Sequence, residues 1–117
     1  MSIRLSKEVL VLSKPGNEEP ITVNYDLLRR AVLTLRAINH PLRKDIIALL
    51  EQNEKMTVTD IYIKLRLEQS VASQHLAILR KANVLQTERD GKFIYYTINK
   101  NRISEIMQIV EQLAQAN

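Results

Sequence analysis

The sequence predicts a single, mainly helical α+β domain, and three observations support this fold class. The chain has 117 residues, which is enough for one hydrophobic core but not for two. Aromatic residues make up only 4% of the chain and there are two glycines, a composition that disfavours a sheet-rich barrel or sandwich. Apolar residues recur every three to four positions along most of the chain, which indicates amphipathic helices.

Residues 1–20 form the least regular part of the sequence, and we expect an N-terminal arm or linker there, followed by the domain at 21–117. Residues 8–13 (EVLVLS) suit either a short strand or a helical turn, and residues 14–20 (KPGNEEP) are typical of a turn. The chain shows neither a long apolar segment nor a secretory signal, so a cytoplasmic protein without membrane contact is expected.

Two helices are predicted next. The first runs from about Asn24 to Ile38, because its apolar residues share one face (Leu28, Ala31, Val32, Leu35 and Ile38). Pro41 suits the first position of a second helix, where its missing N–H costs nothing. The inward face of that helix is formed by Leu42, Ile46, Leu49 and Leu50, and the helix is expected to end near residues 52–53.

The middle of the chain has the pattern of two short helices joined by a tight connection. Residues 57–60 (TVTD) resemble a capping box and place a helix start at Thr57. Residues 66–69 then connect this helix to another that runs from Ser70 to about Ala82. Two short helices with such a connection predict a helix-turn-helix.

A β-hairpin and a last helix complete the predicted fold. Asn83 is expected to end the preceding helix in the left-handed conformation. Asp90-Gly91 lies between two strand-like runs, which indicates a hairpin with positive φ at both of these residues. Asn101 is expected to cap the last helix. The predicted architecture is therefore a winged helix-turn-helix, with a two-stranded hairpin as the wing and long helices at both ends.

The positive charge of the chain is concentrated in one region. Residues 64–102 contain eight basic and three acidic side chains, whereas the rest of the chain has a slight excess of acid. Such a local field attracts a polyanion, although charge alone fits a solubilising face equally well.

The helix from Ser70 to Ala82 has an unusual outer face. At 100° per residue Ala72, Leu76 and Leu79 share one side, and the opposite side carries only small or uncharged groups (Ser70, Ser73, Gln74 and Ala77). Small polar groups permit entry into a DNA major groove, and Gln74 could form two hydrogen bonds with adenine. The other interpretation is a polar solvated face, which the charge and the hairpin make less attractive.

The expected DNA contacts come from this helix and from the wing. Arg80 is placed for phosphates, and His75 lies between the two faces, so that it suits the edge of the core at least as well as a DNA contact. The set comprises Gln69, Ser70, Ser73, Gln74, His75 and Arg80 on the helix, with Arg89 and Lys92 flanking the hairpin tip.

No catalytic or metal-binding pattern is present in the sequence. The chain has no cysteine, and His40 and His75 have no potential ligands at metal-binding spacing. No metal, no cofactor and no enzymatic activity are therefore expected.

The first and last helices carry more apolar surface than a small core needs. A symmetric homodimer would bury it, with an interface formed by Leu28, Val32, Leu35, Ile103, Ile106, Met107, Val110 and Leu113. The alternative is that both stripes fold back onto the core of one chain.

These residues resemble the ArsR/SmtB family of dimeric bacterial repressors over about residues 25–115. The resemblance rests on LRAINHPLRKDIIALL, on LEQSVASQHLAILRKANVL and on the wing TERDGKFIYYTIN. It implies dimerisation through the first and last helices, a pseudo-palindromic operator, and release of DNA when an effector binds. The metal ligands of the family's best-known sensors are missing, because the helix at residue 57 lacks a Cys-x-Cys pair and residues 102–117 lack histidine.

The sequence thus predicts a DNA-binding transcriptional regulator, in the form of a homodimeric repressor that occludes a promoter. The alternative function is a winged-helix module that binds proteins and not DNA. A small-molecule or protein effector is left unassigned.

Overall fold

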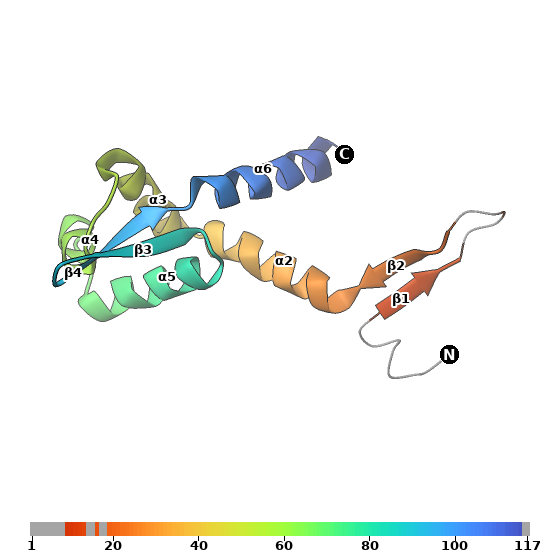
Figure 1. The fold of residues 1–117 in the computed structure, drawn as a ribbon, viewed down its shortest axis with the longest axis horizontal. Helices are drawn as coiled ribbons and strands as arrows, with labels where there is room; N and C mark the ends of the chain where they lie inside the picture. Colours follow the sequence, from red (N-terminus) through yellow and green to blue (C-terminus); the bar gives the residue numbers. More distant parts are fainter. Residues whose placement is uncertain (1–8, 14–15, 17–18, 116–117) are drawn as a thin grey trace. The chain divides into compact units, whose positions relative to one another are not determined.

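The computed structural model describes residues 9–13, 16 and 19–115 of the chain. In chain order its elements are β1 (Val9–Leu12), β2 (Ile21–Asn24), α2 (Tyr25–Ile38), α3 (Pro41–Asn53), α4 (Val58–Lys64), α5 (Gln69–Lys81), β3 (Leu85–Asp90), β4 (Phe93–Ile98) and α6 (Lys100–Gln115) (Figure 1). The chain divides within α2 into two compact units, one up to Thr34 and one from Leu35.

The N-terminal unit contains a β-hairpin and the first part of α2. Strands β1 and β2 pair antiparallel, with Val9 opposite Asn24 and Leu12 opposite Ile21. Of the two structures that suited residues 8–13, the strand is the one observed, at Val9–Leu12, and residue 8 lies outside the described residues. Because residues 21–24 pair with residues 9–12, β2 belongs with the N-terminal arm, and the boundary expected at residue 20 would divide this hairpin. Asn24 then caps α2 by accepting a hydrogen bond from the Leu27 N–H at 3.1 Å.

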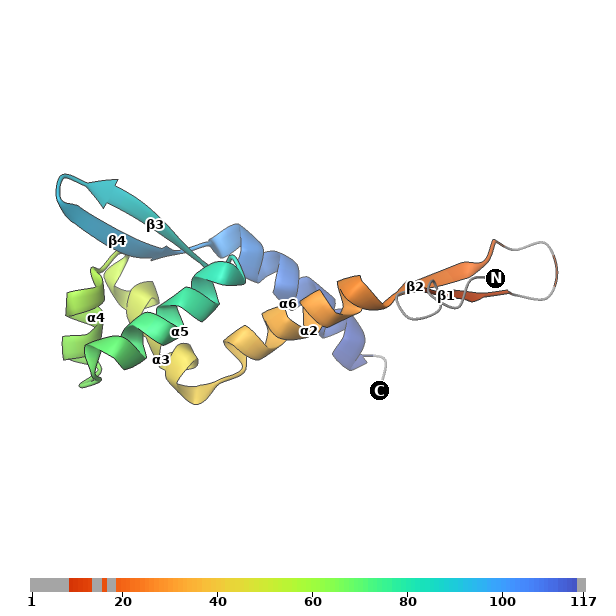
Figure 2. The same cartoon turned by 90° about the horizontal axis from the view of Figure 1, so that it is seen from below.

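The C-terminal unit is built around a helix-turn-helix core. Ile46 and Leu50 of α3, Ile61 of α4, and Leu76 and Leu79 of α5 are each at most 1% exposed and belong to one cluster. Every one of these helices thus contributes its predicted apolar face to the same core. Figure 2 shows α3, α4 and α5 gathered on one side of the β3–β4 hairpin.

Side-chain caps define where α3 and α4 begin. His40 Nδ1 accepts a hydrogen bond from the Leu42 N–H at 3.2 Å, and Pro41 occupies the first helical position, as predicted. Thr57 Oγ1 accepts from the Asp60 N–H at 3.2 Å, which confirms the predicted start of α4. Both caps satisfy N–H groups that a helix leaves unpaired at its first turn.

The two helices of the helix-turn-helix end in the same way. After α4, Arg66 has a φ of +56°, its N–H donates to the Ile63 carbonyl, and the Leu67 N–H donates to the Tyr62 carbonyl. After α5, Asn83 has a φ of +63°, and the corresponding bonds reach back to the carbonyls at residues 80 and 79. These are Schellman motifs, in which a left-handed residue stops the helix. The predicted conformation of Asn83 is confirmed.

The wing is an antiparallel hairpin whose turn differs from the predicted one. Asp90 pairs with Phe93, so the two-residue loop is Gly91-Lys92 and not Asp90-Gly91. Only Gly91 has a positive φ (+63°), which is the sign pattern of a type II′ turn with glycine first. Asp90 therefore remains in the strand, and the expectation of positive φ at Asp90 was wrong.

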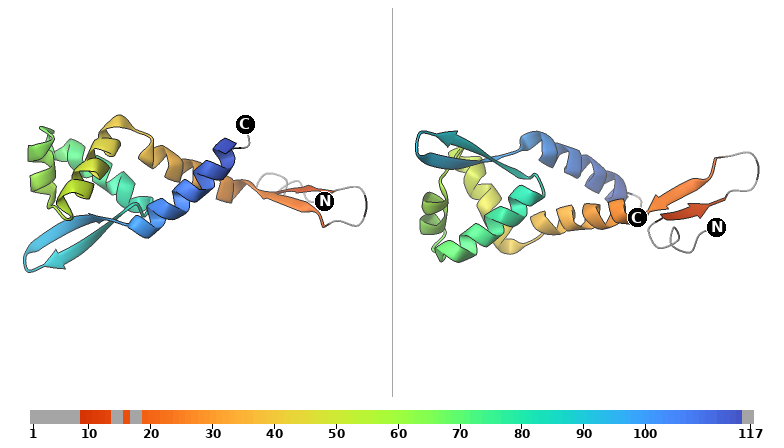
Figure 3. Two further views of the ribbon diagram at one scale, coloured as in Figure 1. Left: turned by 90° about the horizontal axis from the view of Figure 1, so that it is seen from above. Right: turned by 60° about the horizontal axis from the view of Figure 1, so that its bottom comes forward.

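The connection between α3 and α4 adds a short third segment to the wing. Met56 forms an antiparallel bridge with Tyr96, with its N–H and carbonyl bonded to Tyr96 at 3.2 and 2.7 Å. Figure 3 shows this connection running beside the hairpin in two orientations. The bridge attaches the base of the wing to the helical core.

Helix α6 begins two residues earlier than predicted. The side chain of Asn99 accepts a hydrogen bond from the Arg102 N–H at 3.2 Å, so Asn99 and not Asn101 is the cap. The Asn99 amide also donates to the Asn83 carbonyl at 3.1 Å, and Arg102 Nε donates to the Ala82 carbonyl at 3.3 Å. The start of α6 is therefore fastened to the end of α5.

The apolar stripe of α6 divides between the core and the surface. Ile106 is only 5% exposed and belongs to the core of its own chain, so it is not available to the partner for which the sequence suggested it. Ile103 and Val110 are half-buried against the same core, as is Leu35 of α2. Met107 and Leu113 are 45% and 60% exposed. In the described part of the chain no helix is long and apolar enough to span a membrane.

Candidate nucleic-acid interface

Helix α5 presents the two contrasting faces that its sequence predicts. Ala72, Leu76 and Leu79 are fully buried, whereas the side chains on the opposite face (Ser70, Ser73, Gln74 and Ala77) are exposed. None of these exposed side chains is long or charged. The backbone of α5 can therefore approach another surface closely.

The predicted contact residues of α5 fall into two groups. Gln69, Ser70, Ser73, Gln74 and Arg80 are exposed, whereas His75 is half-buried. Gln69 is the first residue of α5, and Glu68 before it makes no side-chain hydrogen bond to the first turn. The N–H groups of that turn thus lack a side-chain cap, and a helix N-terminus of this kind favours anions.

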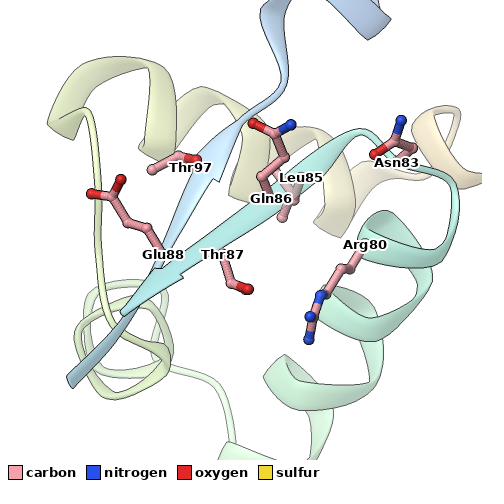
Figure 4. A pocket seen from close by; sticks show the side chains of 7 residues that line it. All are labelled: Arg80, Asn83, Leu85, Gln86, Thr87, Glu88 and Thr97. Atoms are coloured by element: carbon pink, nitrogen blue, oxygen red, sulfur yellow. The ribbon is translucent and has the colours of Figure 1, made fainter. Parts of the chain in front are cut away.

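A polar hollow separates α5 from the wing. Figure 4 shows Arg80 extending from α5 and Thr87 extending from β3 toward the space between them. A neighbouring hollow is lined by Ser73, Ala77, Arg80, Lys81 and Tyr96. Arg80 lines both hollows, so the exposed face of α5 and the wing border a polar surface that contains the cations Arg80 and Lys81 and the carboxylate of Glu88.

The wing has two chemically different faces because side chains alternate along a strand. Arg89 pairs with Ile94 and shares its face with Leu85 and Thr87, the side that borders α5. Glu88 pairs with Tyr95 on the opposite face. Alternation therefore places the basic strand residue Arg89 on the α5 side and the acidic residues Glu88 and Asp90 on the other side, and Lys92 stands exposed at the tip.

Lys55 neutralises the acidic face of the wing. Its ammonium nitrogen lies 3.3 Å from Glu88 Oε1 and 4.7 Å from the centre of the Tyr95 ring. Both groups belong to the face that is turned away from α5. Lys55, which the sequence did not single out, therefore offsets the Glu88 charge and holds the hairpin.

His75 packs against the start of α3 and does not extend freely from α5. Its Nδ1 accepts a hydrogen bond from Arg43 Nε at 3.3 Å, and its ring centroid lies 4.9 Å from that of His40. Burial, followed by the charges of His40 and Arg43, lowers the pKa of His75 below its ordinary value of 6.5. Of the two positions that suited His75 in the sequence, the structure shows the edge of the core.

Arg43 is the residue of this region that sequence reasoning missed. A signal was present, because a cation in the first turn of a helix opposes the helix dipole and needs another reason to be there. That reason is tertiary: Arg43 Nη1 donates to the carbonyls of Arg36 and Ala37, at 3.2 and 3.0 Å. Among the described residues no group of three or more potential metal ligands comes together.

A helix-turn-helix whose second helix carries an exposed polar face beside a β-hairpin is characteristic of the winged-helix class of DNA-binding transcription regulators. Residues 40–87 match the family model described as "Bacterial regulatory protein, arsR family". The chain is 33% identical over 84 residues to the HTH-type transcriptional regulator MJ1325 of Methanocaldococcus jannaschii, covering 72% of this chain and 94% of that protein. The chain belongs to the ArsR family and is a DNA-binding transcriptional regulator.

Two characterised relatives are similar in both sequence and structure. The transcriptional repressor PagR of Bacillus anthracis is 33% identical over 91 residues, covering 78% of this chain and 91% of PagR. Its crystal structure superimposes with a TM-score of 0.60 over 74% of this chain and 99% of that one. The transcriptional activator HlyU of Vibrio cholerae is 32% identical over 89 residues, covering 75% of this chain and 82% of HlyU. Its structure, 26% identical, gives a TM-score of 0.58 over 74% of this chain and 94% of that one.

These relatives bear on the two functions that the sequence left as alternatives. All three are named as transcriptional regulators, which supports the DNA-binding function and lends nothing to a module that binds only proteins. PagR is named a repressor and HlyU an activator, so the family alone leaves the direction of regulation open.

Proposed function

We propose that the protein is a homodimeric repressor that binds an inverted-repeat operator and occludes a promoter. The observation that carries this proposal is the exposed face of α5, where Ser70, Ser73, Gln74 and Ala77 are uncharged and, apart from Ile78 at 41% exposure, no large apolar side chain is exposed, although the opposite face is fully buried. Such a face suits a DNA major groove about 12 Å wide. PagR is named a repressor, in agreement with this proposal, and the transcription experiment below distinguishes repression from activation.

Within this proposal the residues have separate tasks. Gln74, Ser70 and Ser73 contact base edges, and Gln69 lies at the uncapped helix start beside a phosphate. Arg80 on α5 and Arg89 and Lys92 on the wing contact the sugar-phosphate backbone, which sets the position of the protein without recognising sequence. His75 leaves the set of DNA contacts, because its Nδ1 is already bonded to Arg43.

The second copy binds through apolar side chains that remain exposed on one chain. On α2 these are Leu28 and Val32, and on α6 they are Met107 and Leu113. Burying such side chains between two copies removes them from water, which favours association. A two-fold dimer presents two α5 helices to successive major grooves, so the half-sites lie about 10 base pairs apart.

Fluorescence anisotropy with the DNA upstream of the protein's own gene tests the proposal. We expect specific binding that weakens steeply as salt rises, because bound phosphates release counterions. A duplex selected from a random pool should contain an inverted repeat with the spacing given above. Equal affinity for the selected duplex and for a scrambled one would contradict sequence recognition, and transcription that rises on binding would contradict repression.

A further inference from the structure

A hydrogen-bonded junction joins the recognition helix α5 to the end of α2 through one side chain of α3. Arg43 Nη1 donates to two carbonyls in the last turn of α2, those of Arg36 and Ala37. Arg43 Nε donates to His75 Nδ1 on α5 at 3.3 Å. One planar guanidinium therefore bonds to two elements besides its own helix.

The α2 side of the junction is complete. A helix leaves its last four carbonyls without partners inside the helix. Here the Leu35 carbonyl accepts from the Asn39 N–H and the Ile38 carbonyl accepts from the His40 N–H. Arg43 supplies the partners of the remaining two, and its positive charge suits the negative end of the helix dipole. Arg43 is thereby held in place on the side away from α5.

The α5 side of the junction depends on the protonation state of His75. Because Nδ1 accepts the hydrogen bond, it must carry a lone pair, and the neutral ring must have its proton on Nε2. Protonation puts a hydrogen on Nδ1, so that two donors face each other and two cations lie side by side. The groups of α3 and its cap that face His75 are Arg43 and His40, and neither is acidic.

This junction bears on DNA recognition because of where His75 lies in α5. It follows Gln74 directly, while Ala72, Leu76 and Leu79 attach the helix by apolar packing. Apolar packing is not directional, whereas a hydrogen bond from a fixed guanidinium restrains the rotation of α5 about its axis. Such a rotation would move Gln74, Ser70 and Ser73 together relative to the bases.

We propose that Arg43 is a positioning residue for DNA recognition, which holds the recognition helix in orientation through the unprotonated ring of His75, so that acidification weakens operator binding. This inference rests on the proposed function of α5. The proposal predicts that operator affinity falls as the pH is lowered. For most DNA-binding surfaces the opposite holds, since an added proton strengthens the attraction to phosphates.

The proposal is tested by measuring operator affinity with fluorescence anisotropy. The measurement is made at pH 7.5 and at pH 5.5, at constant ionic strength. The probes are a duplex selected by the protein at pH 7.5 and a scrambled duplex of the same composition. We expect wild-type affinity for the selected duplex to fall by up to about 10-fold on acidification, because a pKa below 6.5 limits the fraction of His75 that is protonated at pH 5.5. Affinity for the scrambled duplex should stay constant or rise.

Three variants separate the junction from other effects of pH. His75→Asn keeps an acceptor near the Nδ1 position but does not titrate, so its affinity should be the same at both pH values. Arg43→Met should bind the selected duplex about as weakly at pH 7.5 as the wild type does at pH 5.5. His40→Asn is the matched control, because asparagine is a good N-cap and removes only the other histidine. This variant should lose as much operator affinity on acidification as the wild type does.

Imidazole ¹⁵N shifts of the free protein report the junction without DNA. We expect an unprotonated Nδ1 on His75 at pH 7.5 and a titration below the ordinary pKa, because burial disfavours the charged ring. The proposal would be overturned by a protonated Nδ1 at pH 7.5 or by a wild-type operator affinity that is unchanged or higher at pH 5.5. It would also be overturned if the His75→Asn variant lost as much operator affinity on acidification as the wild type. If no duplex is bound specifically at pH 7.5, the proposed function fails together with the effect on binding, and the ¹⁵N shifts alone decide whether the contact exists.

Discussion

Gln74 is the exposed side chain of α5 with the greatest capacity to distinguish one base from another. Its amide has both a donor and acceptors, which match the N6 and N7 edge of adenine. Its neighbours Ser73 and Ala77 are too short to obstruct it, and all three side chains are exposed. We therefore expect Gln74 to contribute more to base recognition than Ser70 and Ser73, and a single substitution tests this.

Replacing Gln74 with alanine should weaken binding to the operator by about 1–3 kcal/mol, because alanine cannot form the paired hydrogen bonds to a base. Binding to a scrambled duplex should hardly change, since that binding depends on phosphates. Fluorescence anisotropy on the two duplexes measures both quantities. Gln108→Ala on α6 removes the same exposed side chain outside the proposed interface and serves as the control. An equal loss on both duplexes would show that Gln74 does not recognise bases.

At the scale of single elements, the end of α5 depends on the left-handed conformation of Asn83. Its φ of +63° is tolerated by asparagine and is easier still for glycine, whereas a residue with an ordinary side chain pays a steric cost. The two backbone bonds of the Schellman motif and the bond from the Asn99 amide to the Asn83 carbonyl hold this conformation. The side chain of Asn83 is not needed for these three bonds.

We therefore expect Asn83→Ala to lower the free energy of unfolding by about 1 kcal/mol. Asn83→Gly should leave it unchanged or raise it by up to about 1 kcal/mol, since glycine suits this backbone conformation without a steric penalty. Urea unfolding followed by circular dichroism, at one protein concentration for all variants, gives the comparison. A stability order in which alanine exceeds glycine would contradict this account of the helix end.

We expect the wing to contribute to DNA binding through charge and not through sequence recognition. Arg89 lies on the strand face that borders α5, and Lys92 lies at the tip, next to the ring of Phe93. The acidic Glu88 on the other face is paired with Lys55. The hairpin therefore offers phosphates Arg89 and Lys92, while Glu88, which also lines the hollow beside Arg80, is paired with Lys55.

Alanine at both Arg89 and Lys92 should weaken binding to every duplex by a similar factor. The slope of log affinity against log salt should become shallower by about 1 for each phosphate that the variant no longer binds. Lys44→Ala with Lys100→Ala is the matched control, because it removes the same charge from residues that line a hollow between α3 and α6. If the control changed the slope as much as the wing variant, the effect would be one of net charge alone.

At the scale of the whole molecule, apolar side chains remain exposed in both units of the chain. In the N-terminal unit Leu27, Leu28 and Leu33 of α2 are each more than half exposed, and so are Ile109 and Leu113 on α6 in the C-terminal unit. Ile106, which precedes both of them in α6, is buried in its own chain. One face of α6 thus completes the core, and another remains exposed, where we propose that a second copy binds.

Leu113→Glu should convert the proposed dimer to monomer without unfolding the chain. The side chain is 60% exposed in the single chain, so a carboxylate there remains hydrated unless a partner covers it. Sedimentation velocity and circular dichroism measure the two properties, and operator affinity should fall with the loss of the second half-site. Gln108→Glu adds the same charge to the same helix as a control. A Leu113→Glu protein with the same mass and affinity as the wild type would contradict this interface.

The sequence by itself determined the features that depend on local physics. Helical periodicity identified the buried and exposed faces of α5, and Pro41 and the capping box at Thr57 located two helix starts. The left-handed residue after α5 and the existence of the wing followed from Asn83 and from the glycine at 91. Each of these depends on interactions between residues a few positions apart, which the chain order already specifies.

The tertiary structure decided the features that depend on contacts between distant residues. Strand register put Gly91-Lys92 in the turn, and the packing of α6 made Asn99 the cap and moved Ile106 into the core. Only the fold brings Arg43 to His75, 32 residues further along the chain, and to the end of α2. A hydrogen bond between groups so far apart in sequence requires a specific approach of two helices, and helical periodicity carries no information about that distance.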